Sequence, residues 1–156
     1  MSKSLKRVAK ALADAGIEAE IIETGDQTRT AAQAAEQAGC DVDQIAKSII
    51  FKGEDSDAAV LFLTAGGNQV DAGKASAIAG EPLGKADAAL IRAQTGFAIG
   101  GVSPVGHLNP IRAFIDPRLM EFEVIWAAAG TPRHIFSLAP SELVSLTAGQ
   151  LAEFTV

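Results

Sequence analysis

A glycine-rich stretch at residues 95–107, Thr-Gly-Phe-Ala-Ile-Gly-Gly-Val-Ser-Pro-Val-Gly-His, restricts the fold of this chain more than any other segment. Glycine reaches backbone conformations that other residues avoid, and it lets a ligand approach the bare main chain. We expect a short apolar strand at residues 97–99 that runs into a turn at Gly100 and Gly101. The N–H groups of Gly101, Val102 and Ser103 would then point toward one oxygen, an arrangement that binds an anion or a developing oxyanion.

A tight turn between two strands is the simpler interpretation of a glycine pair. The segment favours another one, because apolar residues flank its glycines and no charged residue occurs between Arg92 and Arg112. We therefore interpret it as the floor of a pocket, with Pro104 stiffening the turn.

Elsewhere the hydrophobic pattern changes between the periods of helices and strands. A hairpin turn is expected at residues 53–57, and several other connections are too short for the crossovers that parallel strands require. We therefore predict an α/β (α+β) fold with a mixed, largely antiparallel sheet, curled or barrel-like, surrounded by helices. The length fits a single domain over residues 1–156. The expected helices begin at Ser4, Thr30, Asp71, Asp87 and Pro140, and the expected strands cover residues 17–23, 46–52, 58–64, 111–115, 123–128 and 133–138.

Charge and cysteine content narrow the function classes. A net charge of −6 argues against a broad nucleic-acid footprint such as DNA binding, because phosphate binding needs clustered lysine and arginine. It leaves open contact with only the end of a nucleic acid. The single cysteine, Cys40, and the absence of a secretory leader predict a cytoplasmic protein. The longest strongly apolar run, residues 58–65, is too short to span a membrane.

Lys47 is the most informative charged residue. In the expected strand it shares a face with Ile49 and Phe51, because side chains alternate with a period of two. A lysine on an apolar face lies either at the mouth of a cavity or at a strand end, where its ammonium reaches water. A solvated lysine at a strand start is the more common case, so the pattern alone leaves both open. Lys52, beside the hairpin turn, is expected to be an ordinary surface lysine.

Two familiar kinds of site do not fit the sequence. Ser103 is not a nucleophile of the Gly-x-Ser-x-Gly type, because that elbow needs a glycine at Val105 and an N–H at Pro104. The segment at residues 67–74 misses the spacing of a phosphate-binding loop by one residue, and Ala75 stands where a magnesium-binding hydroxyl is needed.

No metal or other cofactor is predicted. His107, His134 and Cys40 lie far apart and lack the spacing of paired metal ligands. His134 alternates with apolar residues, so a core or pocket-edge histidine is expected there, and a structural hydrogen bond is expected for His107. Trp126 is expected in the core, with a stacking wall for a base as the alternative.

Four segments of the chain resemble the YbaK and prolyl-tRNA-synthetase-associated editing-domain family, and together they span nearly its whole length. They are Thr-Arg-Thr-Ala at 28–31, Ile-Ala-Lys-Ser-Ile-Ile-Phe at 45–51, Gly-Phe-Ala-Ile-Gly-Gly-Val-Ser-Pro-Val-Gly at 96–106 and Ala-Gly-Thr-Pro-Arg at 129–133. The resemblance implies a mixed, barrel-like sheet with surrounding helices. It also implies hydrolysis of the ester of mischarged tRNA, mostly tRNA(Pro) that carries alanine, cysteine or another small amino acid such as serine.

The resemblance also assigns roles to individual residues. Lys47 corresponds to the pocket lysine of the family, and residues 100–104 correspond to its Gly-x-x-x-Pro loop. Related domains place a histidine shortly after a glycine, and His134 follows Gly130 at a longer spacing. The residues expected to act in catalysis are Lys47, Gly100, Gly101, Val102 and Ser103, and those expected to bind substrate are Thr30, Phe97, Ile99, Pro104 and His134.

An aminoacyl ester is already activated, so its hydrolysis needs a positioned water and a stabilised oxyanion more than a strong nucleophile. Under the resemblance, loop N–H groups would hold the carbonyl oxygen, and Lys47 would pair with a terminal phosphate or the ester. A ribose hydroxyl of the tRNA would help to activate the water. Small pockets exclude larger amino acids, and the apolar walls are expected at Phe97, Ile99, Val102 and Val105.

The expected partner is the acceptor end of an aminoacyl-tRNA, with prolyl-tRNA synthetase as a further partner that would deliver it. A basic patch at Lys3, Lys6, Arg7 and Lys10 either contacts tRNA or is the solvated face of the first helix. Two other function classes compete with a deacylase. One is a binding module that holds an amino acid or the aminoacyl end without cleaving it. The other is a hydrolase of another small ester or amide, for which the chain has no recognisable nucleophile–base pair.

Overall fold

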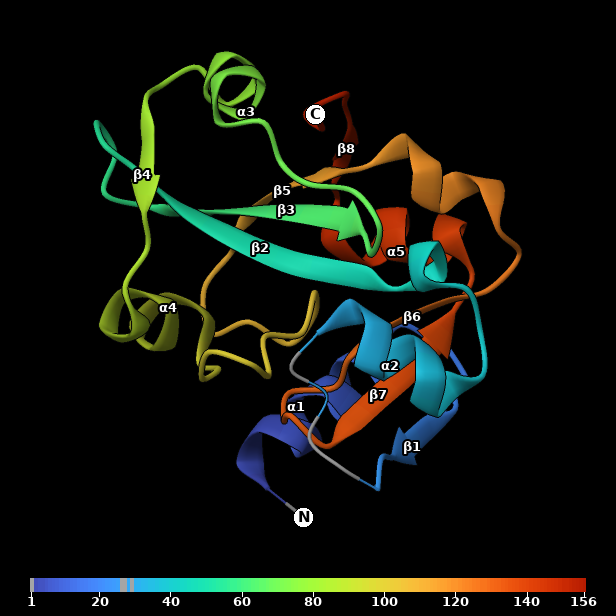
Figure 1. Cartoon of the computed structure of the whole chain (residues 1–156). Coiled ribbons are helices and arrows are strands. Elements are labelled where there is room, and N and C mark those ends of the chain that lie inside the picture. Colours follow the sequence, from blue (N-terminus) through green and yellow to red (C-terminus); the bar gives the residue numbers. More distant parts are fainter. Residues whose placement is uncertain (1, 26–27, 29) are drawn as a thin grey trace.

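The computed structural model describes residues 2–25, 28 and 30–156. Over this part of the chain it contains five α-helices, two 3₁₀ helices and eight strands (Figure 1). In chain order they are α1 (Lys3–Asp14), β1 (Ile21–Glu23), α2 (Ala31–Ala38), η1 (Val42–Gln44), β2 (Ala46–Gly53), β3 (Ala59–Ala65), α3 (Ala72–Ala79), β4 (Leu83–Lys85), α4 (Ala88–Thr95), β5 (Arg112–Ile115), η2 (Pro117–Glu121), β6 (Ile125–Ala128), β7 (His134–Leu138), α5 (Pro140–Thr147) and β8 (Gln150–Leu151). Arg29, in one of the family-like segments, lies outside the described residues.

Capping residues decide where the helices begin. A helix was expected to begin at Thr30, and Thr30 forms a capping box with the third residue of α2 through two hydrogen bonds of 3.1 Å. Asp71 and Asp87 cap α3 and α4 by accepting a hydrogen bond from a main-chain N–H of the first turn. The prediction was wrong at α1, where Ser2 rather than Ser4 supplies the cap through its Oγ.

The strands form two sheets, which confirms the predicted mixed and largely antiparallel arrangement. The larger sheet has the order β4-β2-β3-β5-β8. In it β2 pairs antiparallel with β3 and β4, whereas β5 pairs parallel with β3 and β8. The smaller sheet, β1-β7-β6, is antiparallel. A parallel bridge between Ile45 and Trp126 joins the two sheets. Side chains from both sheets pack into one hydrophobic core.

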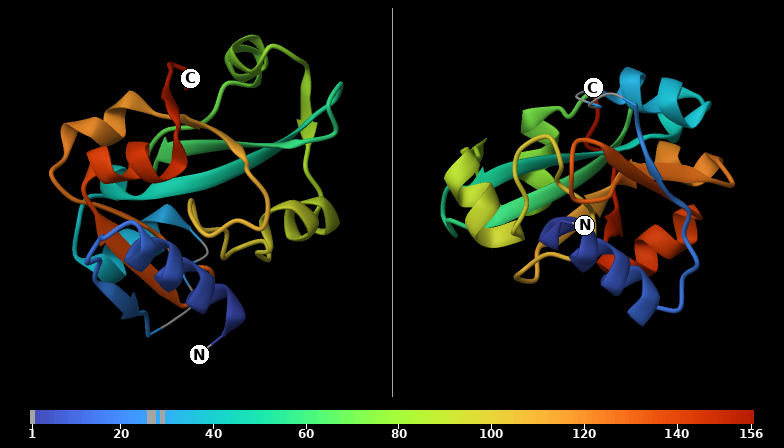
Figure 2. Two further views of the ribbon diagram at one scale, coloured as in Figure 1. Left: turned by 180° about the vertical axis from the view of Figure 1, so that it is seen from behind. Right: turned by 90° about the horizontal axis from the view of Figure 1, so that it is seen from below.

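Helices cover both faces of the larger sheet, and each face has its own core. On one face, α3 packs against Val60 and Phe62 of β3. On the other, Leu61 and Leu63 pack with α1, α4, the smaller sheet and the later part of the glycine-rich stretch. Figures 1 and 2 show α3 on one side of the β2–β3 pair and α1 and α4 on the other. The glycine-rich stretch therefore approaches β2 from the α4 side.

Two local predictions were wrong, and two short strands were missed. Residues 97–99 do not form a strand, because Thr95 Oγ1 accepts the Phe97 N–H at 3.1 Å and turns the chain as α4 ends. The strand expected at residues 17–23 is limited to β1. β4 and β8 were not predicted, since two or three residues carry no readable period and depend on a tertiary partner. No helix in the described part of the chain is long and apolar enough to cross a membrane.

Candidate functional site

Three of the four family-like segments, at 28–31, 45–51 and 96–106, line a cavity of about 620 Å³ at the open edge of β2. β4 pairs only with residues 51–53 of β2, so no described strand pairs with that edge along residues 47–50. α2, the glycine-rich stretch, β6 and β7 complete the wall, and Figure 1 shows α2 and the chain after α4 on the same side of β2. Because the cavity lies at the edge of the sheet, side chains from both faces of β2 can reach it. Its lining therefore includes four successive residues of the strand: Lys47, Ser48, Ile49 and Ile50.

Lys47 lies on the rim of this cavity. It shares a strand face with Ile49, whereas the glycine-rich stretch packs on the other face. Its Nζ donates a hydrogen bond to the main-chain carbonyl of Asn68 at 2.5 Å. Burial lowers the pKa of Lys47, and the nearby carboxylates of Asp116 and Asp43 act in the opposite direction. Lys47 is therefore a partly buried lining residue of the cavity, which agrees with the first of the two alternatives that the sequence left open.

Only part of the glycine-rich stretch faces the cavity. Its lining residues are Ile99, Gly100 and Val102. The N–H of Gly101 is not free, contrary to the prediction, because it donates to the Ala98 carbonyl at 3.1 Å. Among the described residues, the N–H groups of Val102 and Ser103 have no hydrogen-bond acceptor. Of the three predicted donors, Val102 is thus the one that has an unused N–H and also lines the cavity.

Two glycines let the family-like segments approach one another. A Cβ on Gly101 would lie 2.9 Å from the Cα of Thr131, so this glycine packs directly on the main chain of residues 129–133. Gly130 has a φ of +94°, and its Cβ would lie 2.8 Å from the Ser4 carbonyl oxygen of α1. The loop, the turn before β7 and α1 are therefore in contact through bare main chain.

Phe97 and Ser103 lie in the core and do not line the cavity. Both are fully buried, and the Phe97 ring packs under the Arg7 guanidinium at 4.8 Å. Ser103 Oγ accepts the Val105 N–H at 3.3 Å, and the Ser103 carbonyl accepts a hydrogen bond from His107 Nε2 at 2.7 Å. Burial lowers the pKa of His107, and the charge of Arg7 adds to this effect. The predicted structural hydrogen bond of His107 is confirmed.

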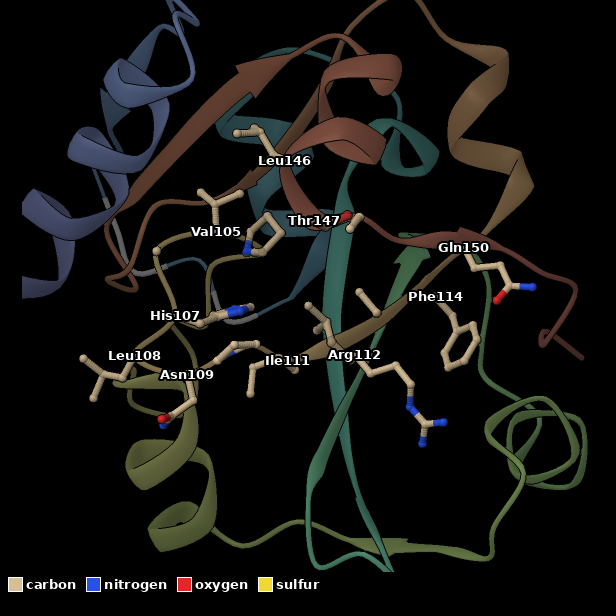
Figure 3. A pocket seen from close by; sticks show the side chains of 16 residues that line it. Val105, His107, Leu108, Asn109, Ile111, Arg112, Phe114, Leu146, Thr147 and Gln150 are labelled. Atoms are coloured by element: carbon tan, nitrogen blue, oxygen red, sulfur yellow. The ribbon is translucent and has the colours of Figure 1, made fainter.

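A second cavity, of about 840 Å³, lies along the later part of the glycine-rich stretch (Figure 3). Pro104 and Val105 line it, together with Arg112 of β5 and Thr147 of α5. The Arg112 guanidinium is already engaged, because Nη1 donates to the Ala79 carbonyl at 2.8 Å. Pro104 and Val105, expected at the substrate pocket, thus belong to a different cavity from Lys47.

His134 and Thr30 take different positions. His134 does not line the Lys47 cavity. Its Nδ1 is 2.6 Å from Thr131 Oγ1, and its Nε2 is 3.8 Å from Glu23 Oε2. Thr30 lines the Lys47 cavity, although its Oγ1 is occupied as the cap of α2. Of the site residues predicted from the sequence, the cavity brings together Lys47, Thr30, Ile99, Gly100 and Val102.

Several lining residues were not predicted at the site, and Thr28 and Ser48 are the polar ones among them. Trp126, expected in the core with a stacking wall for a base as the alternative, is partly buried and lines the cavity. Ser48 Oγ is buried and has no hydrogen-bond partner among the described residues. The only sequence signal for Ser48 was its place next to Lys47. In the described part of the chain, no three histidine, cysteine, aspartate or glutamate side chains gather to hold a metal ion.

Replacing Ser48 with alanine is expected to leave the free energy of unfolding unchanged or to raise it by up to about 1 kcal/mol. The reason is that a buried hydroxyl without a partner costs desolvation energy and returns no hydrogen bond. The matched control is Thr95→Val, which removes a buried hydroxyl that donates to the Ile91 carbonyl at 2.6 Å. Chemical denaturation should show a loss of about 1–3 kcal/mol for the control. A similar loss in Ser48→Ala would contradict the prediction.

Comparison with known proteins agrees with these motifs. Residues 25–146 match the family described as aminoacyl-tRNA editing domain. The chain is 31% identical over 140 residues to the uncharacterized protein YwhH of Bacillus subtilis (strain 168), a match that covers 90% of this chain and 88% of that protein. It is 28% identical over 130 residues to a protein of Enterococcus faecalis (strain ATCC 700802 / V583) named "Putative Cys-tRNA(Pro)/Cys-tRNA(Cys) deacylase EbsC", over 81% of this chain and 77% of that protein.

A solved structure agrees as well. The crystal structure of "a putative trans-editing enzyme for prolyl tRNA synthetase" superposes with a TM-score of 0.93 at 44% identity, over 100% of this chain and 99% of that one. The match extends across the four motifs and across both sheets that frame the Lys47 cavity. This chain therefore belongs to the aminoacyl-tRNA editing domain family, of the YbaK and prolyl-tRNA-synthetase-associated type.

Proposed function

We propose that this protein is a trans-editing deacylase that hydrolyses the ester of mischarged tRNA, with tRNA(Pro) carrying alanine, cysteine or serine as its substrate. The observation that carries the proposal is the cavity at the edge of β2, where Lys47, Gly100 and Val102 meet. Two relatives support this choice of tRNA, because one is named for Cys-tRNA(Pro) and the other is described as acting in trans for prolyl tRNA synthetase. The proposal includes a cytoplasmic location, because charged tRNAs are used there.

The proposed mechanism follows from the chemistry of the ester. The carbonyl oxygen gains negative charge as water adds, and the unused N–H of Val102 would stabilise that charge. Lys47 would bind the terminal phosphate or the ester itself and so fix the reacting carbonyl in the cavity. A ribose hydroxyl of the tRNA would help to position the water. This chain would supply binding and electrostatics, so no protein nucleophile is needed.

The proposed partner is the acceptor end of the tRNA, because the open side of the cavity suits a single chain end better than a helix. Ile99, at the entrance, is 61% exposed and offers an apolar surface there. Arg7 is an unsuitable tRNA contact, because its guanidinium donates to the carbonyls of Gly96 and Gly106. We further propose that prolyl-tRNA synthetase delivers the substrate.

The direct test is to incubate the purified protein with tRNA(Pro) charged in turn with alanine, cysteine, serine and proline. Loss of the amino acid from the small non-cognate esters, with prolyl-tRNA(Pro) left intact, is the expected result. If the protein retains the charged tRNA in a binding assay and releases no amino acid, the alternative function, a binding module for the aminoacyl end, is correct. The combination of a rim lysine with an intact glycine loop favours the deacylase.

Val102 is expected to limit the size of the amino acid that is removed. It is buried and lines the Lys47 cavity, so Val102→Ala should widen the pocket. We expect the deacylation rate of a valyl ester relative to an alanyl ester to rise about 10-fold, since one or two methylenes are worth a factor of about 10–200. The measurement is the ratio of single-turnover rates on the two esters.

Val105→Ala is the matched control. Val105 is a buried valine of the same stretch, but it lines the second cavity. Both variants should lose about 1–2 kcal/mol of unfolding free energy, because both remove buried methyl groups. Only Val102→Ala should alter the amino-acid profile. An identical profile in both variants would remove Val102 from the pocket wall.

A further inference from the structure

Lys47 is held by a neutral group, although two carboxylates lie nearby. Its Nζ donates to the Asn68 carbonyl, and within the described part of the chain it forms no salt bridge. An ammonium has three N–H donors, so two remain after this bond. A direct ion pair would neutralise the charge and compete with a bound anion. A carbonyl orients the ammonium and leaves its charge available.

A hydrogen-bond network fixes this carbonyl. The Asn68 side chain donates from Nδ2 to Asp116 Oδ2 at 2.9 Å, and the same oxygen accepts the Ala65 N–H at 3.1 Å. Asp116 Oδ1 accepts the Arg118 N–H at 3.0 Å, and Asp116 is 3% exposed. The Asn68 N–H donates to the Ala65 carbonyl at 2.9 Å and closes the turn. The turn that carries the carbonyl is therefore fastened to the end of β3 and to the segment after β5.

Two carboxylates lie near the Lys47 ammonium, Asp43 in η1 and Asp116 between β5 and η2. Asp43, in η1, accepts the Gly67 N–H at 2.8 Å and pairs with Arg118 Nε at 3.1 Å, so much of its charge is balanced. Asp116 has no such cation among the described side chains. Burial lowers the pKa of Lys47, and the carboxylates of Asp116 and Asp43 oppose this effect, with Asp116 as the larger of the two opposing contributions.

We propose that Asn68 and Asp116 are positioning residues for Lys47. Asn68 holds the ammonium through its main-chain carbonyl, and Asp116 fixes Asn68 through the hydrogen bond to its side chain. A lysine side chain is long and flexible, so without this support it would sample solvent as well as the cavity. The part that Lys47 plays in catalysis rests on the proposed function, whereas its orientation and charge do not.

The first test is Asn68→Ala, which removes the bond to Asp116 and keeps the main-chain carbonyl. We expect kcat for deacylation of alanyl-tRNA(Pro) to fall about 10-fold, and to fall no further when Lys47 is already alanine, because residues that act as a unit are not additive. Gln69→Ala is the matched control, since Gln69 is an exposed neighbour in the same segment. An equal fall in both Lys47 backgrounds would overturn the proposal.

The second test needs no substrate, so it is independent of the proposed function. The pKa of Lys47 is measured by NMR, with its side-chain signal identified by its loss in Lys47→Arg. Asp116→Asn is expected to lower this pKa, because it removes a nearby negative charge that favours the ammonium. Should Asp116→Asn not fold, Asp43→Asn takes its place and is expected to cause a smaller decrease. An unchanged pKa in a folded variant would overturn the role of the charge.

The two tests also separate the inference from the proposed function. If the wild-type protein cleaves none of the charged tRNAs, the proposed function has failed, and the NMR measurement still decides whether Asp116 controls Lys47. If the protein cleaves alanyl-tRNA(Pro) while the pKa of Lys47 is unchanged in Asp116→Asn, the function stands and the inference fails.

Discussion

The Lys47→Ala variant is expected to lose at least about 100-fold in kcat for alanyl-tRNA(Pro) while it keeps its fold. Removing one preorganised electrostatic contact to a developing charge typically costs a factor of about 10²–10³. The free energy of unfolding should change by less than about 1 kcal/mol, because the side chain is only partly buried and makes one hydrogen bond, to a carbonyl. Single-turnover deacylation and chemical denaturation measure the two quantities.

Lys52→Ala is the control for this prediction. Lys52 lies on the same strand, but its Nζ is 3.3 Å from Asp57 Oδ1 in the hairpin turn, and it does not line the cavity. This is the surface position that the sequence predicted. An exposed ion pair of this kind contributes little, so deacylation should be unchanged. Equal rates for the Lys47 and Lys52 variants would exclude Lys47 from the mechanism.

Gly66→Ala is expected to lower the free energy of unfolding by about 3 kcal/mol, the largest effect on stability that we predict. A Cβ at Gly66 would overlap the main-chain carbonyl oxygen of Val42 and lie 2.9 Å from the Cβ of Ala31. Neither atom is at the end of a flexible side chain, so η1 or α2 must move, and such overpacking costs about 1–3 kcal/mol or more. Ala31, Val42 and Gly66 all line the Lys47 cavity, so deacylation should fall as well.

The control here is Gly73→Ala, in α3. Its nearest neighbour would be Asp71 Oδ1 at 3.3 Å, the oxygen that caps α3, which would have to shift by only a few tenths of an ångström. Alanine is the better helix former by about 0.5–1 kcal/mol, so this variant should be as stable as the wild-type protein or more stable. Thermal and chemical denaturation of the two variants compare the effects. A Gly66→Ala variant of wild-type stability would show that η1 is not packed on this turn.

Where local chemistry determines structure, the sequence predicted the fold well. The structure confirms the predicted helix starts at Thr30, Asp71 and Asp87, where each cap depends on residues three apart in the chain. The β2–β3 hairpin follows from one turn between two apolar runs. The error at residues 97–99 arose because an apolar triplet between glycines is typical of a short strand. In the structure Phe97 is instead buried in the core, with the Arg7 guanidinium over its ring.

The site was harder to predict than the fold. The period of β2 correctly placed Lys47 on a face with Ile49, but it could not show that the cavity opens at the strand's edge. Ser48, on the other face, therefore went unnoticed. Residues 100–104 were predicted to form one loop at the pocket. In the structure they are divided among the Lys47 cavity, the core and a second cavity.

The sequence by itself determined the starts of α2, α3 and α4, the mixed sheet and the family, because each of these is encoded by residues close together in the chain or by a recognisable motif. The tertiary structure alone decided which strand edge stays open, which N–H groups remain unused and which groups face the ammonium. Asn68 is 21 residues from Lys47 along the chain, and Asp116 is 48 residues from Asn68. No local pattern can encode such distances, since packing of the whole chain brings these groups together.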